Sequence, residues 1–124
     1  SFTANPLGCA AANASLDLLE ADPTCHEQFE QRHQVRLERL ACHPRVQRVR
    51  LCGTIAAFDL VTDGEQGYLN PAGKVLRGLV RDQGVLIRPL GDVVYLLPPL
   101  CISDTQLDQC YDALHSGLDA LPGR

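Results

Sequence analysis

The chain has 124 residues and a formal net charge of −4, and 45% of its residues are hydrophobic while 21% are charged. This length is typical of one domain, and the composition is typical of a globular protein. The acidic balance argues against a nucleic-acid partner, and no apolar run approaches the roughly 20 residues that a membrane-spanning helix requires. We therefore expect a globular protein that binds neither nucleic acid nor a membrane.

The six cysteines are widely spread, no Cys-x-x-Cys motif occurs, and no charged-then-apolar leader precedes them. We interpret them as small core residues in a reducing compartment, which predicts a cytoplasmic location. A set of disulfides is the less favoured alternative. The pairs Cys25-His26 and Cys42-His43 carry zinc-ligand types, but neighbours on a helix point in different directions and the separation fits no common zinc motif. No metal site is expected.

In chain order, the first predicted helix opens with Asn5, a typical N-cap residue, and ends at Asp22-Pro23. Its alanine-rich face would let another backbone approach closely, but the chain offers no neighbour for it. Residues 1–22 are therefore interpreted as a helix that links to an absent large domain, and residues 23–124 as a small C-terminal domain. The open apolar face predicts self-association through this helix.

A second helix is predicted from Thr24 to about Cys42, because Thr24 and Glu27 have the spacing of a capping box. Arginines on this helix are expected to face water, and His33 lies near the apolar stripe without a visible partner. The expected solvent-facing arginines are Arg32, Arg36 and Arg39, and the apolar stripe is Phe29, Leu37, Leu40 and Ala41.

The residue pattern then changes to a period of two, which predicts a strand, a bulge or bend at Gly53, and more strand between Val46 and Val61. A polar loop over residues 62–70 precedes a third helix, which starts near Ala72 and is closed by Gly84 as a C-cap glycine.

Two short strands, Val85–Ile87 and Val93–Leu97, are predicted to form a hairpin around a turn that contains proline and glycine. A last amphipathic helix is then predicted, which begins with a second capping box at Ser103 and ends near Leu121. This order of elements predicts an α+β fold, with a small antiparallel or mixed sheet and helices packed on it.

One charge interrupts the apolar run 85–90, namely Arg88. Arginine stays protonated, and its planar fork suits a carboxylate or a phosphate, so it needs either water or an anion. The pattern alone favours an edge arginine with its head in solvent. It likewise favours core packing for Tyr95, since a buried phenol is common in such a strand.

Two stretches resemble class III pyridoxal-phosphate aminotransferases. Residues 1–16 contain Asn-Pro-Leu followed by an alanine run, and their Ala-Asn-Ala-Ser-Leu ending is especially similar to the biotin-pathway branch of that family. Residues 83–91 contain Gln-Gly-Val-Leu-Ile-Arg-Pro, and residues 95–99 read Tyr-Leu-Leu-Pro-Pro, which resemble the same branch. The order of the intervening elements also matches.

The resemblance implies the small C-terminal domain of a fold type I pyridoxal-phosphate transferase, from a homodimeric enzyme. Members of that branch make 7,8-diaminononanoate from 8-amino-7-oxononanoate, with adenosylmethionine as amino donor. By this resemblance, Arg88 holds the substrate carboxylate and Tyr95 lies near the same pocket. Ser1 takes the position of a hydroxyl residue that reaches the cofactor phosphate of the partner subunit.

The departures from the family pattern limit this expectation. The lysine that forms the Schiff base and the aspartate that pairs with the pyridine nitrogen are expected upstream of Ser1, and the one lysine here, Lys74, matches no such motif. The 124-residue chain alone is therefore expected to be inactive. Two alternatives stay open: another class III omega-aminotransferase, and a stand-alone binding module of the same fold.

Overall fold

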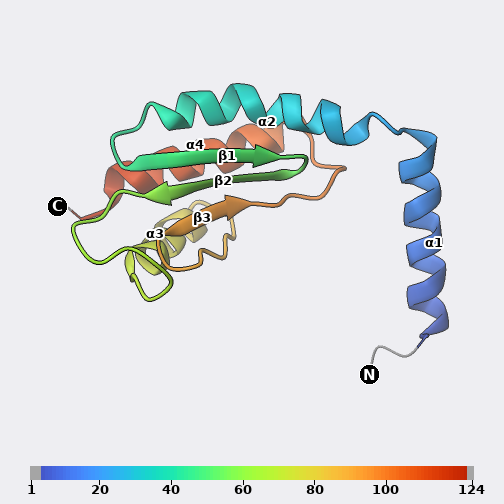
Figure 1. The fold of residues 1–124 in the computed structure, drawn as a ribbon, viewed down its shortest axis with the longest axis horizontal. Coiled ribbons are helices and arrows are strands. Elements are labelled where there is room, and N and C mark those ends of the chain that lie inside the picture. The colour runs from blue at the N-terminus through green and yellow to red at the C-terminus, as the bar shows by residue number, and fades with distance from the viewer. Residues whose placement is uncertain (1–3, 123–124) are drawn as a thin grey trace.

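The fold is taken from a computed structural model, which describes residues 4–122. The elements in chain order are α1 (Pro6–Ala21), α2 (Cys25–Ala41), β1 (Val46–Cys52), β2 (Ile55–Leu60), α3 (Ala72–Arg81), β3 (Val93–Leu96) and α4 (Asp104–Ala120). Figure 1 shows α2, α3 and α4 packed against a small sheet, while α1 stands apart from it. The predicted α+β fold is confirmed.

The sheet has three antiparallel strands in the order β1-β2-β3. Alternate residues of its central strand are buried, since Ala56, Phe58 and Leu60 are each at most 2% exposed. This alternation is the signature of a sheet with one face in the core. These side chains join one cluster with residues of the three packed helices and β3, including Leu40, Leu76, Val94, Leu107 and Leu114.

The predicted break in the strand at Gly53 is confirmed, but it is a two-residue turn that reverses the chain between β1 and β2 rather than a bulge or bend, and Gly53 has a φ of 54° in it. A bulge that the sequence did not reveal lies between Gln47 and Arg50, where Arg48 has a φ of 48°. It places two guanidinium groups, those of Arg48 and Arg50, 2.6 Å from the carboxylate of Asp59. Asp59 is 3% exposed, so this pairing compensates for its burial.

Most of the predicted helix ends are confirmed. The side chain of Asn5 accepts from the backbone N–H of Leu7, and Ser103 forms the complete capping box with Gln106. Gly84 has a φ of 84° beyond α3, where the N–H of Val85 returns to the carbonyl of Val80 as in a glycine C-cap.

The capping box predicted at Thr24 is wrong. The Thr24 hydroxyl donates to the carboxylate of Asp22 over 2.8 Å, and it makes no cap hydrogen bond to the backbone of α2. Asp22, just before the helix, accepts the hydrogen bond of the Thr24 hydroxyl. The capping-box pattern starts at Thr24, so it does not take Asp22 into account.

The strand predicted at Val85–Ile87 is also wrong, and with it the hairpin. These residues are outside every strand, and the chain instead turns tightly where the backbones of Leu90 and Val93 bond each other. Ile87 is 3% exposed but Leu86 is 69% exposed, so one side chain anchors the segment to the core. Pro89 has no backbone N–H that could pair with a neighbouring strand. The strand β3 pairs with β2 rather than with the segment Val85–Ile87.

Two of the arginines predicted to face water are instead bound to α4. Arg32 lies 2.9 Å from Asp104, and Arg36 lies 2.7 Å from Asp108 and is only 17% exposed. The prediction failed because the acidic partners lie about 70 residues farther along the chain, beyond any local pattern.

Helix α1 has no buried residues, and Leu7 and Leu18 are 81% and 74% exposed. No helix within residues 4–122 is both long and apolar enough to span a membrane. The division into a linking helix and a small domain stays a prediction.

Candidate functional site

Two adjacent clefts lie between α3, β3 and the start of α4. One has a volume of about 610 Å³ and is lined by the segment 84–88, the segment 95–102 and part of α4. The other has a volume of about 480 Å³ and is lined by α3, the loop before it and the turn at Gly91. Arg88 and Tyr95 belong to the walls of both clefts, so the structure brings these two sequence-predicted residues together.

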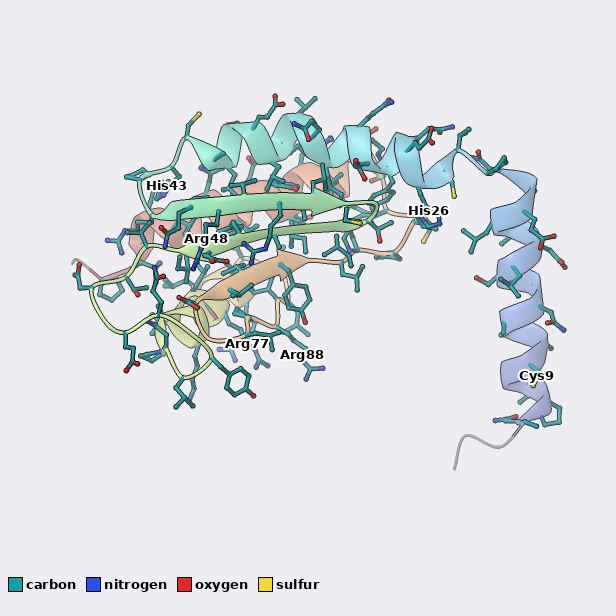
Figure 2. The ribbon with its side chains drawn as sticks, viewed as in Figure 1. Cys9, His26, His43, Arg48, Arg77 and Arg88 are labelled. Atoms are coloured by element: carbon teal, nitrogen blue, oxygen red, sulfur yellow. The ribbon has the colours of Figure 1, made fainter. Side chains whose placement is uncertain are left out.

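The side chain of Arg88 is exposed, and it has no hydrogen bond or ion pair with any described residue. Its neighbour Ile87 is buried and fixes the backbone on which the guanidinium is carried. Figure 2 shows Arg88 projecting away from the sheet. The five N–H donors of the guanidinium are therefore open to an anion in either cleft.

Tyr95 is half-buried in β3, where its backbone is paired with Ala57. Its strand neighbours Val94 and Leu96 are buried, so Tyr95 points to the opposite face of the sheet. Core packing, which the pattern favoured for this residue, is therefore wrong. The ring forms part of a cleft wall instead.

Close packing at two glycines holds the Arg88 segment against α3. A Cβ at Gly73 would overlap the carbonyl oxygen of Gly91 and would lie 2.6 Å from Cβ of Pro89. A Cβ at Gly91 would lie 2.6 Å from Cα of Tyr68, and Gly91 has a φ of 64°. Only glycine fits either position, and this approach is what brings α3 beside Arg88.

Two cations that the sequence did not single out line the smaller cleft, namely Lys74 and Arg77. They are three residues apart on α3, so they share one helix face. A signal for them does exist in the sequence, because Ala72–Arg81 contains no acidic residue to pair with them.

The remaining candidates are structural or fall outside the described part. His33 is buried, and its Nδ1 lies 2.7 Å from the hydroxyl of Tyr111. Burial lowers the pKa of His33 to about 4, and the charge of Arg36 acts in the same direction. Ser1 lies outside the described residues. Residues 4–122 contain no cluster of three metal-ligand side chains. The six cysteines are free thiols, but their interpretation as core residues is wrong, because four of them are exposed and Cys25 and Cys110 are only half-buried.

Comparison with known proteins gives the family. A sequence profile for "Aminotransferase class-III" matches residues 1–118. The chain belongs to this family. An adenosylmethionine-8-amino-7-oxononanoate aminotransferase of Synechococcus elongatus is 50% identical over 121 residues, which cover 98% of this chain and 28% of that protein. A protein of the same name from Geobacter sulfurreducens is 36% identical over 99% of this class III chain and 28% of its own length.

Solved structures agree with this assignment. The adenosylmethionine-8-amino-7-oxononanoate aminotransferase of Methanocaldococcus jannaschii has a TM-score of 0.82 and 27% identity, covering 99% of this chain and 30% of that one. A structure described as a transaminase with L-ala has a TM-score of 0.78 and 31% identity, covering 92% of this chain and 28% of that one. The chain thus spans under a third of the length of the relatives it matches.

Class III aminotransferases use pyridoxal phosphate, and an omega transaminase of Pseudomonas jessenii with 25% identity and a TM-score of 0.71 was solved in complex with PMP. The described residues do not form a site for this cofactor. Their single lysine, Lys74, is exposed on α3 and has no carboxylate beside it in the cleft that it lines.

Proposed function

We propose that the complete gene product is a pyridoxal-phosphate aminotransferase of biotin biosynthesis. In this proposal it converts 8-amino-7-oxononanoate to 7,8-diaminononanoate, with adenosylmethionine as amino donor. The observation that carries the proposal is the 50% identity, over 98% of this chain, to a relative named for that reaction. When bound, the cofactor supplies the electron sink of amino transfer.

The described residues contribute the substrate side. The exposed guanidinium of Arg88 binds the substrate carboxylate, which its planar fork can hold by two parallel hydrogen bonds. Tyr95 closes the wall beside it and lines the path of the aliphatic chain. Holding the carboxylate end fixes where the amino-ketone end of the substrate lies, and this orientation lowers the entropy cost of reaction.

The test is an Arg88→Ala substitution in the complete gene product. Loss of a charged, bidentate contact predicts a fall of about 100-fold in kcat/KM for 8-amino-7-oxononanoate. The absorbance of bound cofactor is expected to stay unchanged. Arg88→Lys keeps the charge but not the fork and is expected to recover only part of the loss. Arg39→Ala is the control, since Arg39 is 75% exposed on α2 and lines neither cleft.

Normal kinetics in the Arg88→Ala protein would show that Arg88 does not bind the substrate. Failure of the native protein to use 8-amino-7-oxononanoate would instead favour a second candidate, another class III omega-aminotransferase. The 31% identity to the transaminase solved with L-ala supports that candidate. A panel of amines with and without a carboxylate distinguishes the two.

The proposal includes a cytoplasmic homodimer, in which the Ser1 hydroxyl reaches the cofactor phosphate bound in the partner subunit. This part rests on the family resemblance. Sedimentation of the complete gene product tests the dimer, and Ser1→Ala is expected to weaken cofactor binding without changing the KM for the amino ketone.

A further inference from the structure

The smaller cleft carries an unbalanced positive charge. Lys74, Arg77 and Arg88 all line it, whereas no aspartate or glutamate does. The nearest carboxylate along the chain, Asp92, is 1% exposed and turned inward, where it accepts from the backbone N–H of Gly67. The whole chain is acidic, with a formal charge of −4, so this local excess of cations is not a general property of its surface.

These three cations also differ from the others in their partners. Within residues 4–122, none of the three has a hydrogen bond or an ion pair from its side chain. The other described arginines each have a carboxylate or carbonyl partner, as Arg36 has in Asp108 and Arg81 has in Asp82. Among the described lysine and arginine side chains, the three without a partner thus all line one cleft, where their N–H donors are available to a ligand.

The fold fixes the relative positions of these three cations. Lys74 and Arg77 share one face of α3, and Figure 2 shows Arg77 and Arg88 projecting on the same side of the molecule. The contact between Gly73 and the turn at Gly91 fixes the distance between α3 and the segment that carries Arg88.

We infer that Lys74, Arg77 and Arg88 form one anion-binding groove that receives the carboxylate end of the substrate, with Lys74 and Arg77 as positioning residues beside Arg88. This inference rests on the proposed function. The proposed substrate carries a carboxylate at one end and an ammonium near the other, so three cations draw in the first end and repel the second. The groove therefore selects the orientation in which the substrate enters.

The effect of Lys74 and Arg77 on the kinetics of the enzyme can be predicted. Exposed charges each contribute little, and salt screens them. A contact at the distant end of the substrate is made equally in the ground state and the transition state, so it lowers KM and leaves kcat unchanged. A purely structural role of Lys74 and Arg77 would not produce a salt-dependent KM.

The experiment uses the complete gene product with Lys74→Gln and Arg77→Gln combined. The KM for 8-amino-7-oxononanoate is expected to rise about five-fold at low salt, with kcat changed by less than about two-fold. Added salt should raise the KM of the native enzyme toward that of the variant. The matched control is Arg39→Gln with Arg81→Gln, which removes the same charge from two exposed arginines outside the cleft.

A binding measurement separates this inference from the proposed function. Calorimetric titration with octanoate, a carboxylate that cannot react, is expected to give about five-fold weaker binding in the Lys74/Arg77 variant than in the control. Octanamide, which is neutral, should bind both variants equally. Equal KM and equal octanoate affinity in variant and control would overturn the groove. A native protein without aminotransferase activity would overturn the proposed function, and the titration would still decide on the groove.

Discussion

His33 is a buried histidine whose protonation the fold opposes. It is fully inaccessible within α2, its Nδ1 bonds the hydroxyl of Tyr111, and its Nε2 has no partner among the described residues. Burial, aided by the charge of Arg36, lowers the pKa from the ordinary value of 6.5 to about 4. Between these two values the unfolded chain binds a proton that the folded chain does not, so acid favours unfolding there.

We predict that the contact between α2 and α4 loses stability as pH falls from 6.5 to 4, by about 3 kcal/mol in total, with no further loss from His33 below pH 4. The measurement is amide hydrogen exchange in α2 and α4 of the complete gene product at several pH values. His33→Asn, which keeps an acceptor for Tyr111 but does not titrate, should flatten the dependence. Exposed His26 replaced by Asn is the control, and an unchanged slope in the His33 variant would contradict the assignment.

The position of α3 depends on a contact that admits no side chain. A Cβ at Gly73 would overlap backbone at Gly91, whereas a Cβ at Gly78 on the same helix would meet nothing within 4 Å. The two glycines have the same intrinsic helix propensity, so tertiary contact alone makes them different.

Gly73→Ala is therefore expected to destabilise the α3 contact by about 3 kcal/mol and to weaken octanoate binding, because the Arg88 segment must move. Gly78→Ala is expected to stabilise α3 by about 1 kcal/mol and to leave binding unchanged. Hydrogen exchange in α3 together with the octanoate titration measures both effects. Similar behaviour of the two variants would show that the Gly73 contact does not position the site.

The helix ends illustrate which elements are predictable from sequence. The caps at Asn5, Ser103 and Gly84 are confirmed because each depends on groups within five residues. The strand predicted at Val85–Ile87 is wrong because an apolar run says nothing about whether a partner edge is available. The edge of β2 is taken by Val93–Leu96, and this pairing spans about 40 residues of chain.

Among the helices and strands of residues 4–122, α1 is the one with no buried residue. Leu7 and Leu18 are largely exposed, and with Ala11 and Ala14 they lie along one side of the helix. The packed helices, in contrast, each contribute to the core. An exposed apolar stripe of this kind favours association with another surface.

We predict that the 124-residue chain in isolation self-associates through α1. Leu7→Glu with Leu18→Glu should shift it toward monomer in sedimentation experiments, because charges then interrupt the stripe. Asn13→Glu adds charge on the opposite side of α1 and should leave the association unchanged. A chain that is already monomeric at all concentrations would contradict the prediction.

The helices, most of their caps, the fold class and the choice of Arg88 could be predicted from the sequence, because each depends on neighbouring residues or on a motif within about ten positions. The cap predicted at Thr24 is the exception. The packing of the elements was needed to show that the Tyr95 ring leaves the core, that Arg32 and Arg36 bind α4, and that Lys74 and Arg77 lie beside Arg88. These relations join residues that are distant along the chain, and they follow from how the layers pack. Arg88 remains the predicted carboxylate ligand, now with two further cations in its cleft.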